Sequence, residues 1–215
     1  VTVPGRNMYT PRSTRPDDVR QHPNAIVKMA RVIEKIETWA RQYEASHSFD
    51  SPCGRVVPKV VIGAIRGGIP YRPNRTSPHC AIYVDVRIVP GEDPLRVERE
   101  LQEVVASAEV GARVETFLAR NGAVGKNVEP LAAEVRRCYQ QVTGREPLAP
   151  ASNEVVSMWR DNNVFNAAGI PALTFGCARN KAEDGRLYLD VAELVATATV
   201  YAQVAHSLCD RPVQR

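Results

Sequence analysis

The sequence has little histidine, few aromatic residues and no long apolar run. Only four histidines occur among 215 residues, and they stand far apart in the chain. A catalytic metal site needs several closely placed histidine and carboxylate groups, so we expect this chain by itself to hold no metal. No apolar stretch approaches the roughly 20 residues that a membrane-spanning helix requires, and we therefore expect no membrane partner.

Positive charge is in slight excess but is not concentrated. The chain has 28 basic and 24 acidic side chains, a net charge of +4, and the two signs alternate along it. A nucleic-acid-binding domain concentrates basic residues on one face and interleaves aromatic ones. A ferredoxin-like domain of that kind would need aromatic side chains on its sheet, where only Tyr83 is available. We expect no nucleic-acid partner.

The cysteines form neither a disulfide framework nor a zinc-binding pair. Five are present, an odd number, and no two have the C-x-x-C spacing. This usage is typical of reduced thiols, so we expect a cytoplasmic location. The chain starts without methionine and no signal peptide is visible. Because its first three residues have the composition of a strand end, we expect a piece of a longer protein. The cysteines are Cys53, Cys80, Cys138, Cys177 and Cys209.

The first half alternates strands and helices. Asn24 precedes apolar residues spaced three and four apart, which predicts a helix over residues 25–44. Residues 80–88 alternate between apolar and polar, as in a strand with one buried face. Further strands are expected at residues 1–3, 59–65 and 112–118, with a helix from Pro94. This order is the βαββαβ plan of a ferredoxin-like α+β domain, expected over residues 1–120.

The second half, residues 121–215, reads as an incomplete α/β segment. We expect helices over residues 130–144, 162–168 and 191–208, with a short strand at residues 170–175. Asp161 and Asp190 are expected to cap the second and third of these helices. Three helices with one or two strands are too few to close an α/β layer. The last helix is expected to bury Val191, Leu194, Val195, Ala198, Tyr201, Ala205 and Leu208.

Several motifs, in order along the chain, resemble the M20 family of metallopeptidases and aminoacylases. The segment GGIPYRPN at residues 67–74 precedes YVDVR at residues 83–87. Gly5-Arg6, Asn24-Ala25-Ile26 and Arg160-Asp161 also match, as does GIPALTFG at residues 169–176. The order and spacing of these segments carry the resemblance over nearly the whole chain.

The resemblance implies a zinc-dependent catalytic domain interrupted by a ferredoxin-like lid that pairs two subunits. This chain would supply the lid and the C-terminal portion of the catalytic domain. The complete protein would use one or two zinc ions to hydrolyse an amide next to a free carboxylate, in a small peptide or an N-acyl amino acid. The family's zinc-ligand motifs precede the lid and are absent here, so this chain alone is expected to be inactive.

Two positions depart from the family pattern. Where relatives place a lid histidine that stabilises the tetrahedral intermediate, this chain has Tyr9, which could donate one hydrogen bond to an oxyanion. A tyrosine packed in a loop is the competing interpretation. The family also places a metal-binding histidine after the Phe-Gly segment. Here only Glu183 and Asp184 lie near that position.

The resemblance assigns substrate binding to residues in both halves. Arg87 would hold the substrate carboxylate with its guanidinium fork, whereas an exposed arginine paired with Asp85 is the alternative. Asn74 would donate to the carboxylate or the oxyanion, or serve as a turn residue. Gly68 would let the backbone approach the ligand, or serve its turn.

The remaining assigned residues, Arg160, Asp161 and Asn162, would contact the substrate from the catalytic domain. For Asp161 a plain helix cap is the competing interpretation. A function of a different class also stays open: the chain could be a non-catalytic dimerisation and ligand-binding module.

Overall fold

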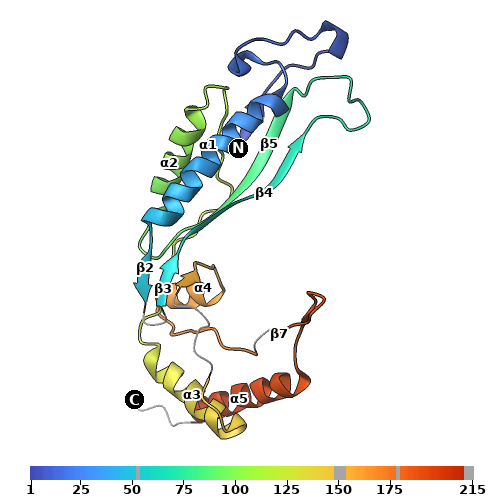
Figure 1. Cartoon of the computed structure of the whole chain (residues 1–215). Coiled ribbons are helices and arrows are strands. Elements are labelled where there is room, and N and C mark those ends of the chain that lie inside the picture. The colour runs from blue at the N-terminus through green and yellow to red at the C-terminus, as the bar shows by residue number, and fades with distance from the viewer. Residues whose placement is uncertain (52–53, 148–153, 178–179, 211–215) are drawn as a thin grey trace. The chain divides into compact units, whose positions relative to one another are not determined.

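The computed structural model describes residues 1–51, 54–147, 154–177 and 180–210. The chain divides into two compact units. The first contains Val1–Gly122 together with a later segment around residues 154–159, and the second contains residues 123–147 and 160–210 among those described. Elements of both units are labelled in Figure 1.

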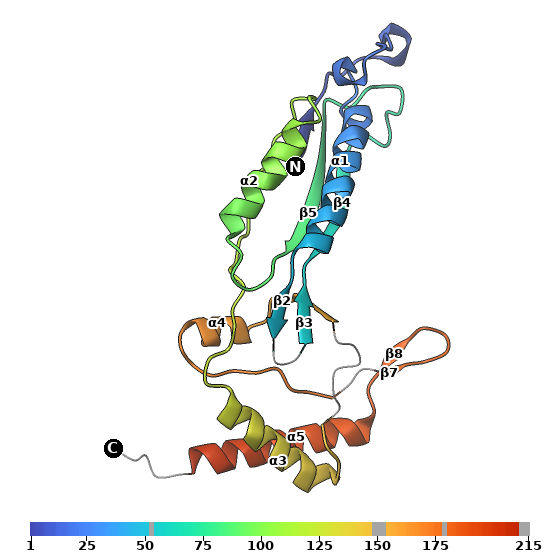
Figure 2. The ribbon, with the colours of Figure 1, turned by 60° about the vertical axis from the view of Figure 1, so that its left-hand side comes forward.

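The first unit is built on a three-stranded antiparallel sheet. Its strands are β1 (Thr2–Pro4), β4 (Lys59–Gly67) and β5 (His79–Arg87), in the order β1-β5-β4. Helices α1 (Ala25–Ser46) and α2 (Pro94–Ala106) lie side by side against the sheet (Figures 1 and 2). Since β1 and β4 are both antiparallel to β5, they run parallel to each other with β5 inserted, which is a split βαβ arrangement.

Local capping and apolar spacing explain both helices. The Asn24 side chain accepts a hydrogen bond from the Ile26 amide, and Asp93 accepts one from Leu95 at the start of α2. Both helices bury one apolar face against β5, where Cys80 and Ile82 are buried as their alternation predicted. The core residues of the helices are Ala25, Met29, Val32, Ile36, Trp39, Ala40, Tyr43, Val97, Leu101 and Val105.

The strand expected at residues 112–118 is not formed. Arg113 makes a single bridge to Thr2, with two backbone hydrogen bonds of 2.9 Å each. Because β1 is only three residues long, its edge is too short to pair with all of residues 112–118. The four-stranded ferredoxin-like plan is therefore incomplete, and three strands make up the sheet.

A second small sheet, which the sequence analysis did not predict, combines two strands that follow α1 in the sequence with one from much later in the chain. Strands β2 (Phe49–Ser51) and β3 (Gly54–Val57) are antiparallel neighbours, and β6 (Glu154–Val156) pairs with β3 in parallel. Pro52 and Cys53, between β2 and β3 in the sequence, lie outside the described residues. The β3–β6 pairing brings a late segment of the chain into the first unit.

The second unit is mainly helical. Helix α3 (Glu129–Thr143) packs on α5 (Val191–Cys209), while α4 (Asn162–Ala167) is short. Strands β7 (Asn180–Lys181) and β8 (Leu187–Tyr188) form a small hairpin. The strand expected at residues 170–175 is not formed: no described strand pairs with this segment, and the Asn166 side chain holds it by bonding both the N–H and the C=O of Ala172.

Helix α5 buries a different face from the predicted one. Thr197, Val200 and Val204 are its buried residues, and every member of the predicted stripe is exposed. Val191, Leu194 and Val195 have 73%, 50% and 60% of their surface exposed. The helix is apolar around most of its circumference, so periodicity could not select the face that α3 covers.

Candidate functional site

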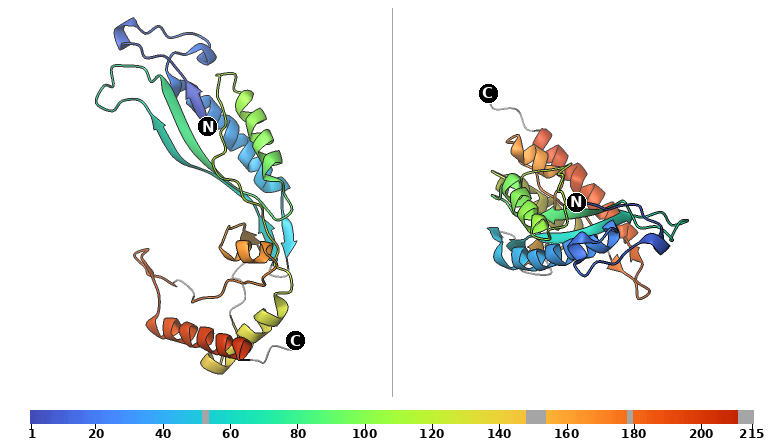
Figure 3. Two further views of the ribbon diagram at one scale, coloured as in Figure 1. Left: turned by 180° about the vertical axis from the view of Figure 1, so that it is seen from behind. Right: turned by 90° about the horizontal axis from the view of Figure 1, so that it is seen from above.

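Two loops at one end of the first sheet are joined into a tip, which we define as residues 6–12 and 69–76. The Thr10 amide donates to the Asn74 carbonyl at 2.9 Å, and the Thr76 amide donates to Met8 at 2.9 Å. Between these bonds, Tyr9 and Arg75 form an antiparallel bridge. Figure 3 shows both loops extending from the same end of the sheet. In the tip, Tyr9 therefore lies opposite Arg75, and Asn74, the residue before Arg75, is bonded to Thr10, the residue after Tyr9.

Residues of the recognised motifs anchor this tip to α1. Ser77 is buried and receives a hydrogen bond from the Gly68 amide at 2.9 Å. Its carbonyl accepts from Ala25, and its amide donates to the Asn24 side chain. A Cβ on Gly5 would lie 2.4 Å from the Ser77 carbonyl oxygen, so only glycine fits there.

Gly68 has a φ of +76°, a backbone conformation that side chains rarely adopt. Its amide is already bonded to Ser77. The positive φ and the bond to Ser77 are sufficient reason for a glycine in this turn. Its assignment to ligand binding stays a prediction.

Tyr9 is not packed into the fold. Its side chain is 45% exposed, and the cross-strand partner Arg75 lies directly opposite. Asn7 accepts a hydrogen bond from Arg75 Nη1 at 3.2 Å. Arg75 was not among the predicted site residues, because a pairing between positions 9 and 75 leaves no periodic signal in the sequence.

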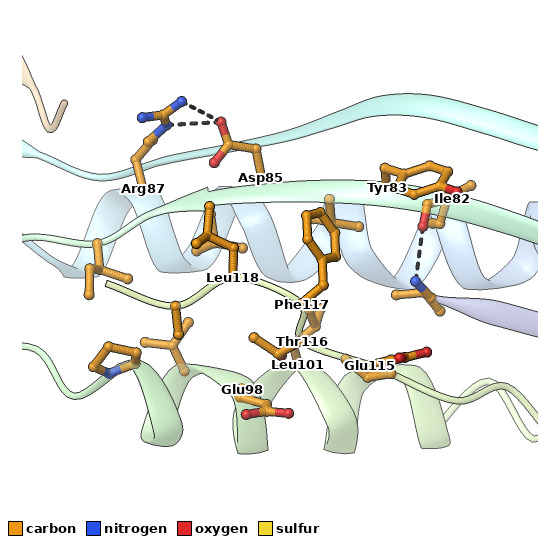
Figure 4. Close-up of a pocket in the computed structure, with 18 of the residues that line it drawn as sticks. Ile82, Tyr83, Asp85, Arg87, Glu98, Leu101, Glu115, Thr116, Phe117 and Leu118 are labelled. Carbon is orange, nitrogen blue, oxygen red and sulfur yellow. Dashed lines mark hydrogen bonds and ion pairs between the residues drawn. The ribbon is translucent and has the colours of Figure 1, made fainter. Parts of the chain in front are cut away.

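Arg87 lies at the opposite end of β5 from the tip. Its Nε and Nη2 both lie 2.8 Å from Asp85 Oδ2, the pairing proposed as the alternative to substrate binding. Figure 4 shows these two side chains together on one side of β5, with Leu101 on the other. At about 3.3 Å per strand residue, the length of β5 separates Arg87 from the tip by roughly 26 Å. One copy of the first unit therefore cannot bring Arg87 and Asn74 to the same carboxylate.

A pocket of about 590 Å³ lies between β5, α2 and the segment 114–120. Apolar side chains such as Ile82, Leu101 and Phe117 form much of its lining, and Arg87 and Glu98 border it. Phe117 makes an edge-on contact with Tyr83. Neither Tyr9 nor Asn74 lines this pocket, so it is separate from the tip.

The second unit holds the other predicted binding residues at the start of α4. Asp161 occupies the N-cap position, but its side chain makes no capping hydrogen bond, so the expected cap is wrong. Asn162 Nδ2 donates to Thr174 at 3.3 Å, and its buried Oδ1 has no hydrogen-bond partner among the described residues. Arg160 precedes them in sequence and makes further contacts of its own.

No group of three or more histidine, cysteine, aspartate or glutamate side chains comes together among the described residues in a way that could hold a metal ion. Glu183 and Asp184 lie in the connection between β7 and β8. There Asp184 binds the backbone and side chain of Arg186, which lower its pKa below the usual range. The donor set described here does not fit the zinc site that the resemblance implies.

Glu134 is the one buried carboxylate among the described residues, and its partners are structural. It lies on α3 and is bonded to Arg137 on the same helix and to Ser207 on α5. The Arg137 guanidinium, followed by the Ser207 hydroxyl, lowers the pKa of Glu134 to about 2. An ionised carboxylate so fully engaged serves the α3–α5 contact.

None of the helices in the described part of the chain has the length and apolar composition that crossing a bilayer requires.

Comparison with known proteins identifies the first unit. The family model of the M20 peptidase dimerisation domain matches residues 15–112 of this chain. The fold is similar to that of a tripeptidase from Staphylococcus aureus, with a TM-score of 0.58 at 15% identity over 98% of this chain and 50% of that one. It is also similar to aminopeptidase PepT from Bacillus cereus, with a TM-score of 0.55 at 17% identity over 97% and 50% of the two chains.

An M20 family metallo-carboxypeptidase from Sulfolobus solfataricus is similar to the same extent, with a TM-score of 0.55 at 14% identity over 94% of this chain and 56% of that one. The present chain thus spans about half the length of these relatives. Together with the split βαβ sheet and its two helices, the family match shows that residues 15–112 form a peptidase dimerisation domain of the M20 family.

Proposed function

We propose that this chain is the lid and C-terminal portion of a metal-dependent amidohydrolase or exopeptidase. The complete protein would cleave an amide next to a free carboxylate, in a small peptide or an N-acyl amino acid. The observation that carries the proposal is the dimerisation-domain match over residues 15–112, a domain of M20 peptidases. The peptidases with a similar fold support it.

The surface of the second unit supports its place in a larger catalytic domain. Helix α5 exposes Val191, Leu194 and Val195, although its buried face is already covered by α3. Apolar surface of this extent on a helix is normally covered by further structure. We propose that the remainder of an α/β catalytic domain covers it.

The lid is proposed to pair two subunits into a homodimer. Strand β4 is an edge of the first sheet, and Val61 on it is 51% exposed. An unpaired edge strand with apolar side chains is a ready surface for pairing with a second copy. This surface supports a dimer contact through β4.

We keep the predicted site residues as substrate contacts in this proposal, in three groups. Tyr9, Asn74 and Gly68 belong to the tip or its base, Arg87 lies at the far end of β5, and Arg160, Asp161 and Asn162 belong to the second unit. Because one lid cannot bring the tip and Arg87 to one substrate, the proposal requires two subunits to complete each site. That requirement agrees with the resemblance, in which the lid pairs two subunits.

The zinc ions implied by the resemblance are proposed to be held by other parts of the complete protein. The described residues of this chain offer no suitable cluster of ligands. We also propose a cytoplasmic location, supported by the free thiols of Cys80, Cys138, Cys177 and Cys209.

The test is an assay of the complete protein against N-acetyl amino acids and dipeptides. The protein is stripped with a chelator and then reloaded with zinc. We expect hydrolysis that is lost on stripping and restored by zinc. A hydrolysis rate that is unchanged by the chelator would overturn the metal-dependent assignment.

A non-catalytic dimerisation and ligand-binding module is the second candidate. For this chain taken by itself, the lack of a metal-ligand cluster among the described residues favours it. It predicts that the complete protein forms a dimer and hydrolyses none of these substrates under either condition.

A further inference from the structure

We propose that Arg75 and Tyr9 together form a carboxylate-binding site at the tip, with Asn7 positioning the arginine. The ligand is the free carboxylate of the substrate, so the inference rests on the proposed function. It moves recognition of the carboxylate charge from Arg87, where the sequence resemblance assigned it, to a residue at the other end of the sheet.

The bridge geometry places the two side chains together. Tyr9 and Arg75 are directly opposite each other in an antiparallel pair. Side chains at directly opposed positions point to the same face, about 4.5–5.5 Å apart at their Cβ atoms. Hydrogen bonds on both sides of the bridge, from Thr10 to Asn74 and from Thr76 to Met8, fix this register. The phenol and the guanidinium therefore share one exposed face.

Asn7 orients the guanidinium without neutralising it. Its side-chain oxygen accepts from Arg75 Nη1 at 3.2 Å, and an amide carries no charge. This contact engages Nη1, which leaves the Nε and Nη2 edge of the guanidinium for a ligand. That edge presents two parallel N–H donors, the geometry that binds a carboxylate through both oxygens.

The charge at Arg75 is uncompensated, in contrast to that at Arg87. Among the described residues, no carboxylate lies within ion-pair distance of Arg75, whereas Asp85 binds Arg87 through two nitrogens at 2.8 Å. A substrate carboxylate at Arg87 would have to compete with Asp85 and would meet its negative charge. At Arg75 it would meet a free positive charge and could accept a further hydrogen bond from Tyr9.

The experiment measures binding to the complete protein by calorimetry, with N-acetylalanine and N-acetylalaninamide as probes. The two differ only in the terminal group, which is a charged carboxylate in the first and a neutral amide in the second. We expect the wild type to prefer the acid about tenfold or more, as a charge-assisted hydrogen-bonded pair provides. Arg75→Gln should abolish the preference, Arg75→Lys should restore part of it, and Tyr9→Phe should reduce it.

Arg72→Gln is the matched control, because it removes the same charge from the same tip but has no bridge to Tyr9. It should keep the wild-type preference. Thermal unfolding of each variant separates lost binding from lost folding. The proposal is overturned if Arg75→Gln retains the preference, if Arg87→Gln rather than Arg75→Gln removes it, or if the wild type shows none. Hydrolysis of N-acetylalanine is scored separately and reports on the proposed function alone.

Discussion

Gly5 illustrates how a motif residue can act through the backbone. Three backbone atoms, from Ser77, Ala25 and Pro23, lie within 2.4–2.7 Å of where its Cβ would be. The first strand, the start of α1 and the loop before β5 therefore converge on this one position. Such crowding explains why a glycine stands directly before the tip.

Replacing Gly5 by alanine should destabilise the first unit. Backbone atoms cannot move aside as a flexible side chain would, so we expect a loss of about 1–3 kcal/mol in the free energy of unfolding, typical of overpacking. Thermal and denaturant unfolding measure it. Gly63→Ala is the control, because nothing lies within 4 Å of a Cβ at that position. Equal stability of the two variants would contradict the crowding argument.

Arg87 and Arg75 show which parts of the candidate site could be predicted from the sequence. The pairing of Arg87 with Asp85 could be proposed from their spacing of two in a strand, and the structure contains it. The role of Arg75 could not be proposed, because its partner Tyr9 is distant in sequence. Local spacing identifies contacts within an element, while contacts between loops depend on the register of the fold.

At the scale of elements, helix α5 offers a direct test of which face is covered. Val200 is fully buried against α3, whereas Val195 is 60% exposed. We expect Val200→Ala to cost this chain about 1–3 kcal/mol through lost burial and a cavity. Val195→Ala should change the stability by no more than about 0.5 kcal/mol. Chemical denaturation followed by circular dichroism measures both.

The expected effect of Val195→Ala on stability is different in the complete protein. If the rest of a catalytic domain covers α5, Val195→Ala should then become destabilising by a similar amount to Val200→Ala. An unchanged, near-neutral effect in the complete protein would show that this face stays in solvent, and the proposed catalytic-domain contact would fail.

Elements with strong local signals were predicted well. Helices α1, α2 and α3 have a capping residue or a first-turn proline and a clear apolar stripe, and strand β5 alternates regularly. The short strands β2 and β3 were missed, because three or four residues show little periodicity. The strand expected at residues 112–118 was a false prediction. The composition of this segment suits a strand, but the edge of β1 that it would pair with is only three residues long.

For the whole molecule, the central prediction is dimerisation through β4. Val61→Lys places a charge on the proposed contact, and we expect the dimer to weaken by about tenfold or more. Because the position is half exposed, the subunit should remain folded. Sedimentation velocity over a range of concentrations measures the effect. Leu95→Lys, at an exposed apolar position on α2, is the control; if it weakens the dimer and Val61→Lys does not, the interface lies elsewhere.

The parallel pairing of β3 with β6 has a consequence for synthesis. Arg55 pairs with Glu154, so the edge of β3 cannot be completed until the later strand has been made. At a translation rate of about 5–20 residues per second, the ribosome needs roughly 5–20 s to reach it. During that interval β3 carries an unpaired edge, the kind of surface on which a neighbouring nascent chain can pair.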